Sequence, residues 1–272
     1  MNERATQNAK VEKIKNGWRL GIQKGDSLHY RDAQLDDYSQ LPRHKFPHQT
    51  ISLSLLAKTS SSSIAGTWGF GLWNDPFGLS LGFGGSPFPL PALNAVWFFL
   101  GRGENYLSFK NELPKTGQPQ GPAPTYPANG FMAQTFRSPK FHPLLILAGL
   151  TLPFSRKAAR KLLSKVIDED GVSLWNMQEH PQGTRAPALQ KVDVTQWHAY
   201  RLEWSEKRVV WYLDDILVFE SSVSPNASRP LGVIIWIDNQ YAAFTPEGKI
   251  AFGVLEGGNE WLEIEDIVIS EK

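Results

Sequence analysis

The sequence contains no cysteine, carries almost no net charge and lacks a long apolar run. Without cysteine the chain has no disulfide framework and no thiolate chemistry, and the commonest structural zinc sites are excluded. Its 28 Lys and Arg residues nearly balance 27 Asp and Glu residues, so we expect no overall attraction to nucleic acid or to an anionic membrane. The longest apolar run, from Pro143 to Phe154, is shorter than the roughly 18 to 20 residues that a membrane-spanning helix needs.

The first residues, "MNERATQNAKVEKIKNGWRL", lack the apolar central segment of a secretory signal. If residue 1 is the native start, we expect the protein to stay in the cytoplasm, although a chain that had lost its signal would look the same. With 272 residues, of which 41% are hydrophobic, the chain can bury one large core. We therefore expect a single domain over residues 1–272.

Short alternating or β-branched runs between turn residues predict many strands and few helices. The 23 Gly and 19 Pro residues supply the turns. The clearest runs are "TISLSLLAKTS", "AVWFFLGR", "WHAYRLEWS", "RVVWYLDDILVFESS" and "LGVIIWID". This pattern is typical of an antiparallel β-sandwich. Residues 111–130 read as a Pro-rich surface loop within it.

Two neighbouring segments carry a resemblance to a known family. The segments "WHAYRLEW" and "WYLDDILV" lie on either side of a short polar turn. They resemble the paired strands of the concanavalin A-like lectin and glucanase superfamily, and family 16 glycoside hydrolases in particular. The stretches "IAGTWGFGLWND" and "WLEIEDIVIS" are similar to other strands of that superfamily. The resemblance implies an all-β jelly-roll sandwich of two antiparallel sheets, with a concave face that in the family holds glycans.

The chain departs from this family at its catalytic motif. Family 16 enzymes carry Glu-x-Asp-x-Glu on one strand, where the two-residue period turns all three carboxylates to the same face. No such spacing occurs in this sequence. We therefore expect no retaining glucanase activity, and we expect no release of reducing sugar from β-glucans.

Aspartates that follow aromatic strands are the candidate site residues. In "GFGLWNDPFG", Trp73 and Asp75 share a strand face, and in "VIIWIDNQY", Trp236 and Asp238 do so. A Trp wall can stack on a ligand, and a carboxyl in apolar surroundings can act as a general acid, so Asp75 and Asp238 are the catalytic candidates. The alternative is that each Asp caps a strand-end turn. The ligand-binding candidates are Trp73, Asn74, Trp97, Trp236 and Asn239.

The segment "HYRDAQLDDYSQ" raises the question of an ion site. Asp32, Gln34, Asp36 and Asp37 are closely spaced oxygen donors of the kind that calcium accepts. The segment lacks the Gly-containing ligand loop of an EF-hand, so a polar loop or a first strand is the favoured interpretation. The histidines show no metal-ligand spacing, and we predict no metal and no cofactor.

Residues 141–167 are predicted to form a helical insertion. From Arg156 onward, apolar residues fall on one helical face and basic residues on the other, with Ser155 as the N-cap. The basic residues expected to point outward are Arg156, Lys157, Arg160, Lys161 and Lys165. The insertion either covers an apolar site or rests on lipid headgroups, and the alternative is that it only adds a small separate core.

Together these patterns favour a protein that binds an apolar or amphipathic small molecule in an aromatic-lined cleft. Acid–base chemistry of the cyclisation or isomerisation type is the accompanying hypothesis, and the sequence leaves turnover open. Two alternatives remain: a glycan-binding protein or divergent glycoside hydrolase, and a peripheral membrane protein without catalysis.

Overall fold

The structure is a computed structural model, and it describes residues 1–42, 45–75, 93–110, 129–139, 142–151, 154–175, 192–245 and 249–271. Most of the Pro-rich segment 111–130 lies outside these described residues. So does most of the apolar segment that follows Asp75.

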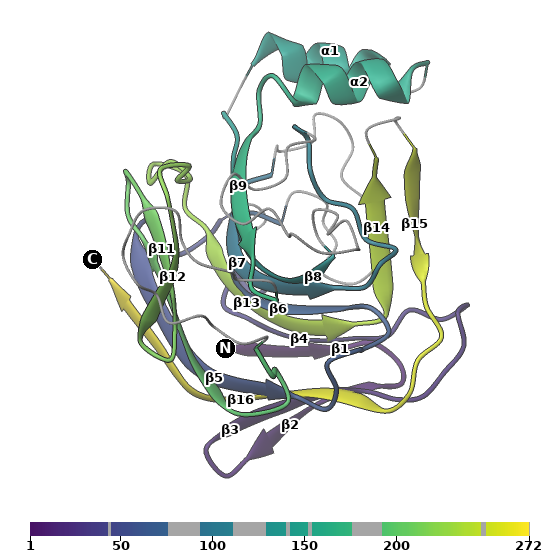
Figure 1. Cartoon of the computed structure of the whole chain (residues 1–272), viewed down its shortest axis with the longest axis vertical. Coiled ribbons are helices and arrows are strands. Elements are labelled where there is room, and N and C mark those ends of the chain that lie inside the picture. Colours follow the sequence, from purple (N-terminus) through teal and green to yellow (C-terminus); the bar gives the residue numbers. More distant parts are fainter. Residues whose placement is uncertain are drawn as a thin grey trace.

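The described residues form two large antiparallel sheets (Figure 1). The first sheet has the order β1 (Asn2–Ala5), β4 (Asp32–Asp36), β13 (Gly232–Asp238), β6 (Thr67–Trp73), β7 (Ala95–Gly101), β8 (Gly130–Arg137) and β9 (Asp168–Ser173). The second has the order β12 (Ile216–Ser221), β11 (Val209–Leu213), β10 (His198–Trp204), β5 (Ile51–Thr59), β16 (Glu260–Glu271), β3 (Gly17–Ile22) and β2 (Ala9–Ile14). A separate hairpin joins β14 (Gln240–Phe244) and β15 (Ile250–Val254).

The main core lies between the two sheets. Strand β5 alternates strictly between buried and partly exposed residues, because its second face points outward. The buried side chains of β5 meet alternate residues of the first sheet, including Trp68, Phe70 and Phe98. This is the jelly-roll sandwich of two antiparallel sheets that the sequence predicts.

Strands in the middle of the first sheet are buried on both faces. Every residue of β6 and of β7 is buried, so the face that points away from the second sheet is covered as well. Figure 1 shows the first sheet curving so that β9 rises at one side, while the separate β14–β15 hairpin rises at the other. We call this face of the first sheet, which points away from the second, the concave face.

One segment crosses from the β14–β15 hairpin to β9 along the concave side. At one end, Asn105 accepts a hydrogen bond from the Ala242 amide at 3.0 Å. At the other end, Glu169 on β9 accepts hydrogen bonds from the backbone amides of Phe109 and Lys110 at 2.8 and 3.0 Å. The segment from Asn105 to Lys110 is thus held at both ends, and its apolar side chains pack against the concave face.

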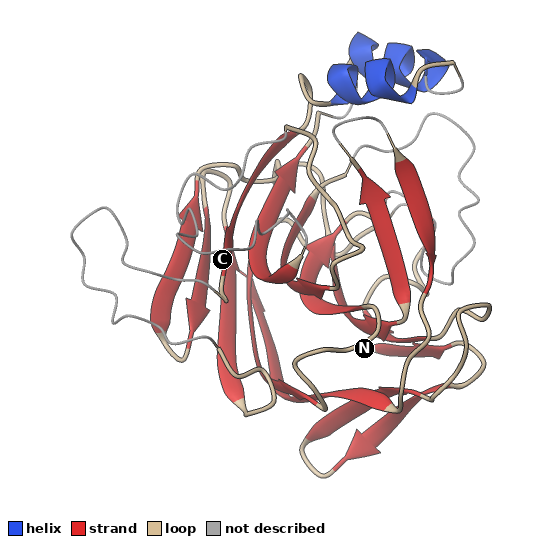
Figure 2. Ribbon diagram, turned by 45° about the vertical axis from the view of Figure 1, so that its right-hand side comes forward, coloured by secondary structure: helices blue, strands red, loops and turns tan. Residues whose placement is uncertain are grey.

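Two short helices lie at one end of the molecule (Figure 2). They are α1 (Pro143–Thr151) and α2 (Arg156–Leu163). The predicted N-cap is confirmed, because the Ser155 hydroxyl accepts a hydrogen bond from the Ala158 amide at 3.3 Å. None of the helices in the described part of the chain is long and apolar enough to cross a membrane.

The prediction that all five basic residues of α2 and its flank point outward is wrong for Arg160. This side chain is only 4% exposed, and its Nη2 donates a hydrogen bond to the carbonyl oxygen of Ser108 at 2.6 Å. Residue 160 directly follows Ala159, which is fully buried, so both face the body of the protein. The amphipathic pattern did not show this because a long side chain can turn its charged end toward a backbone acceptor.

Candidate functional site

Alternation along the strands of the first sheet sorts their residues between the main core and the concave face. On β6, Trp68, Phe70 and Leu72 enter the main core, so Thr67 and Trp73 point to the concave face. Gly69 lies between these two on the same face, and a Cβ at this position would come within 2.5 Å of the Trp236 ring. The absent side chain gives this indole room to lie against β6.

The concave face carries an aromatic layer that we call the aromatic floor. Its indoles contact one another in sequence: ring centroids are 6.4 Å apart for Trp73 and Trp97, and 5.9 Å apart for Trp97 and Trp236. Phe99 and Phe136 extend the layer, and Leu163 of α2 packs against it. The floor therefore unites the predicted tryptophans Trp73, Trp97 and Trp236, which are far apart in the sequence.

Each indole N–H of the floor is hydrogen-bonded within the protein. Trp73 donates to the Tyr38 hydroxyl at 2.7 Å, and Trp97 donates to Gln134 at 3.4 Å. Trp236 donates to the Thr67 hydroxyl at 2.9 Å. Trp73 and Trp97 are only 8% and 6% exposed, whereas Trp236 is partly exposed. Trp236 is thus the floor indole that a ligand can reach most readily.

Asp238 lies beside Trp236 at the end of β13, on the same face. One carboxylate oxygen, Oδ1, accepts hydrogen bonds from the Thr67 amide at 3.1 Å, from the Thr67 hydroxyl at 2.7 Å and from the Gln240 amide at 3.2 Å. The side chain is 7% exposed. Burial raises the pKa of Asp238 to about 7, against the lowering effect of these three hydrogen bonds. This carboxyl group can therefore exchange a proton near neutral pH.

Asp75 follows β6 (Thr67–Trp73) and lies at the other end of the strands from Asp238. In the register of β6 and β13, Asp238 pairs with Thr67 and Gly232 pairs with Trp73. The two ends are roughly 20 Å apart along the strand. Asp75 lies close enough to the Tyr38 phenol to contribute, after burial, to raising its pKa. The sequence-predicted carboxylates are thus not brought together.

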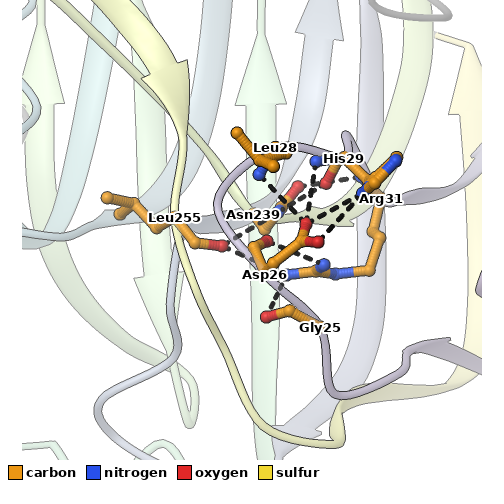
Figure 3. Close-up of polar contacts among 7 residues, drawn as sticks. All are labelled: Gly25, Asp26, Leu28, His29, Arg31, Asn239 and Leu255. Atoms are coloured by element: carbon orange, nitrogen blue, oxygen red, sulfur yellow. Dashed lines mark hydrogen bonds and ion pairs between the residues drawn. The ribbon is translucent and has the colours of Figure 1, made fainter.

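The two predicted asparagines hold backbone segments together. Asn74 Oδ1 accepts a hydrogen bond from the Asn94 amide at 2.9 Å, which closes the start of the loop between β6 and β7. Asn239 accepts from the Arg31 amide at 2.8 Å and donates to the carbonyl oxygens of His29 and Leu255 at 3.1 and 2.9 Å (Figure 3). Because Asn239 is fully buried, we assign it a structural role.

Asp32 also lies on this face beside Asp238, a position that the sequence patterns did not predict. The segment from Asp32 to Asp36 is a strand and not a polar loop, although it is the fourth strand along the chain, β4, and not the first. Ala33 and Leu35 enter the main core, so Asp32, Gln34 and Asp36 all point to the concave face. Asp32 pairs with Asp238 in the register of β4 and β13. The period of two, with small and apolar residues between the polar ones, was the available signal.

The other aspartates of this segment are held by hydrogen bonds within the fold. Asp36 accepts from Gln34 at 2.8 Å and from the Ser39 amide at 2.8 Å. Asp37 contacts His48 at 2.6 Å and accepts from the Val233 amide at 2.9 Å. Within the described ranges, no three His, Asp or Glu side chains are grouped so that they could hold a metal ion.

Known proteins resemble this chain in the arrangement of their strands alone. No family model matches the chain, and no curated protein sequence matches it. Among solved structures, the laminarinase catalytic domain from Thermotoga maritima is 12% identical with a TM-score of 0.43, covering 98% of this chain and 81% of that chain. The Bacillus licheniformis β-glucanase is 10% identical with a TM-score of 0.41, covering 97% of this chain and 82% of that chain. A carbohydrate binding module from Bacillus subtilis is 8% identical with a TM-score of 0.37, covering 99% and 95% of the two chains.

Proposed function

We propose that the concave face binds a largely apolar or amphipathic molecule beside Trp236, and that Asp238 exchanges a proton with it. The observation that carries this proposal is the position of Asp238. Its buried carboxyl group, with a pKa of about 7, lies next to the most accessible indole of an aromatic floor. A carboxyl group with such a pKa can act as an acid or as a base at neutral pH. The reaction class is an isomerisation or cyclisation, which needs no co-reactant.

The polarity of the aromatic floor favours an apolar ligand over a sugar. Sugars are held by stacking and by polar groups that reach their hydroxyls. The three indole N–H groups of the floor already donate to acceptors within the protein. The remaining floor residues are mostly apolar, so an apolar ligand surface suits them better.

Ligand binding is tested by native mass spectrometry of the purified chain against two panels, one of fatty-acyl and polyprenyl lipids and one of β-glucan oligosaccharides. We expect lipid adducts, and Trp236→Ala should weaken them by about 1–3 kcal/mol through lost apolar contact. The matched control is Trp197→Ala, because Trp197 is 37% exposed and immediately precedes β10 of the second sheet. Adducts with oligosaccharides alone would instead favour the glycan alternative.

A second candidate property is contact of the α1–α2 hairpin with an anionic lipid surface. Leu147, Leu150 and Phe154 are 45%, 62% and 91% exposed. Residues 141–167 contain no acidic side chain, and the exposed basic residues beside the apolar ones are Arg156, Lys157, Lys161 and Lys165. Exposed apolar side chains flanked by basic ones are typical of helices that rest on anionic headgroups.

Vesicle flotation tests this contact. We expect the protein to float with vesicles that contain phosphatidylserine and to remain unbound with phosphatidylcholine alone. Replacing Leu150 and Phe154 by Ser should reduce binding by at least about tenfold. The matched control is Leu217→Ser on β12, where the side chain is 41% exposed. Equal flotation of both variants would rule out the hairpin as the contact surface.

A further inference from the structure

We propose that Asp32 and Asp238 form one acid–base pair, in which Asp32 donates a proton to the ligand and Asp238 accepts one from it. This inference deepens the proposed function, because it assigns a second residue to the same site and gives each carboxyl group a direction of transfer. It rests on the position of the two side chains in the sheet, on the difference between their hydrogen-bond partners and on their burial.

The register of β4 and β13 sets the two carboxyl groups directly opposite each other. The Asn239 amide donates to the Arg31 carbonyl oxygen at 3.2 Å, so Asn239 and Arg31 form a hydrogen-bonded pair of the antiparallel ladder. The next pair along, Asp238 and Asp32, is then a non-hydrogen-bonded pair. In such pairs the Cα atoms are only about 4.5 Å apart and the side chains lie closest.

Both carboxyl groups of this pair are buried, which raises the cost of ionising them together. Asp32 is 3% exposed and Asp238 is 7% exposed. Two carboxylates that face each other in a poorly hydrated site cannot both be ionised at low cost, so such a pair retains a proton. An arrangement of this kind is destabilising for the fold. We therefore expect it to have a functional role.

The partners of the two carboxyl groups decide which one keeps the proton. Asp238 accepts three hydrogen bonds, all of which favour its charged form. The Asp32 carboxyl group accepts no hydrogen bond from the residues that the structure describes; only its backbone is bonded, to Thr6. The oxygens of this carboxyl group are not fully enclosed by the protein, so solvent still reaches them. Asp238 therefore ionises first, and Asp32 stays protonated.

The charged groups around the pair support the same order. Burial raises the pKa of Asp32 well above its ordinary value; the charges of Asp238 and Asp36 add to this effect, and Arg4 on β1 opposes it. Burial, followed by the charges of Asp32 and Asp238, also raises the pKa of the neighbouring Tyr30 phenol. These effects agree with the hydrogen bonds in making Asp238 the carboxyl group that ionises more readily.

In the proposed reaction one carboxyl group gives a proton to the ligand and the other takes one from it, so no other proton donor or acceptor is needed. The O–H bond of Asp32 breaks, and its proton forms a new bond with a basic atom of the ligand, such as a carbonyl oxygen. A C–H bond of the ligand then breaks; its electron pair stays in the ligand, and the proton passes to the Asp238 carboxylate. Transfer of that proton to the facing Asp32 restores the starting state. A face of the Trp236 ring can stabilise the cationic intermediate.

The test is a titration of the ligand-free protein, followed through the carboxyl carbons of ¹³C-labelled aspartate by NMR. In Asp238→Asn, the apparent pKa of Asp32 should fall by about one to two units, because the facing charge is lost. In Asp32→Asn, the apparent pKa of Asp238 should stay near 7, because Asp32 is already neutral when Asp238 ionises. The control Asp36→Asn removes a carboxylate from the same strand and should leave Asp238 nearly unchanged.

Two results would overturn the pair. An Asp32 pKa that does not change in Asp238→Asn would show that the two carboxyl groups titrate independently. If instead the Asp238 pKa fell in Asp32→Asn while the Asp32 pKa stayed unchanged in Asp238→Asn, the roles of the two residues would be reversed. If a variant does not fold, the wild-type infrared spectrum is informative, because a protonated-carboxyl band must persist at neutral pH. Since no ligand is present, these outcomes are separate from a failure to bind the lipid panel, which would reject the proposed function instead.

Discussion

Thr67 and Asp238 share two hydrogen bonds across the β6–β13 pair, since both the amide and the hydroxyl of Thr67 donate to Oδ1 of Asp238, at 3.1 and 2.7 Å. The same hydroxyl accepts the indole N–H of Trp236 at 2.9 Å. Thr67 thus fixes the direction of both side chains of the proposed site. Because the hydroxyl bond is the largest of the effects that lower the Asp238 pKa, Thr67 opposes the rise in pKa that burial causes.

Replacing Thr67 by Val tests that role while keeping the shape of the side chain. The variant removes the hydroxyl bond to Asp238, so we expect the Asp238 pKa to rise above 7. The measurement is the ¹³C titration of the aspartate carboxyl groups. Thr135→Val is the control, because its hydroxyl donates to Val223 on the opposite side of the sheet. A similar shift in both variants, or none in Thr67→Val, would contradict the assignment.

The stability of the protein should depend on pH through the same carboxyl groups. The native pKa of Asp238 is about 7, against an ordinary value of 3.8, so the folded chain holds more protons than the unfolded chain between about pH 4 and 7. The contribution of this group to the free energy of unfolding therefore falls as pH rises through that window.

Comparison with Asp238→Asn isolates this contribution from that of carboxylates with lowered pKa values, such as Asp168 and Glu263. In urea unfolding, the variant should gain stability relative to the wild type as pH rises from 4 to 7, by at least about 1 kcal/mol. The difference should level off above pH 7. A difference that is constant with pH would mean that Asp238 has an ordinary pKa.

Arg160 is expected to hold the helical insertion against the body of the protein. Its guanidinium donates to the carbonyl oxygen of Ser108, in the segment that crosses to β9. Arg160→Met should leave this buried acceptor without its partner, at a cost of about 1–3 kcal/mol, and hydrogen exchange in α2 should become faster. Arg156→Met, on the exposed side of the same helix, should change little. Equal hydrogen exchange in both variants would show that the apolar contacts of Leu163 are enough to hold α2 against the body of the protein.

The alternation of residues in single strands was enough to predict the sheets and the aromatic face. It placed Trp236 and Asp238 on one side of β13, as the structure has them. The period of 3.6 residues and Ser155 likewise predicted α2 and its start. These features are local, because they depend on residues only a few positions apart.

The pairing of the carboxyl groups could not be read in the same way. Asp32 meets Asp238 through a register between strands about 200 positions apart in the sequence, fixed by the buried contacts of Asn239 with Arg31. The same long-range register separates Asp75 from Asp238, although both follow a Trp. Single-strand patterns identify a face, whereas only the order of the strands determines which residues meet on it.

Photo-crosslinking with a diazirine-bearing fatty acid tests the central claim most directly, since it reports where an amphipathic molecule lies on the wild-type chain. We predict that mass spectrometry will locate the label on the concave face, in peptides that contain Trp236 and Asp238, and that unlabelled fatty acid will compete it away. Labelling confined to α1 and α2, or to the outer face of the second sheet, would contradict a binding site on the aromatic floor.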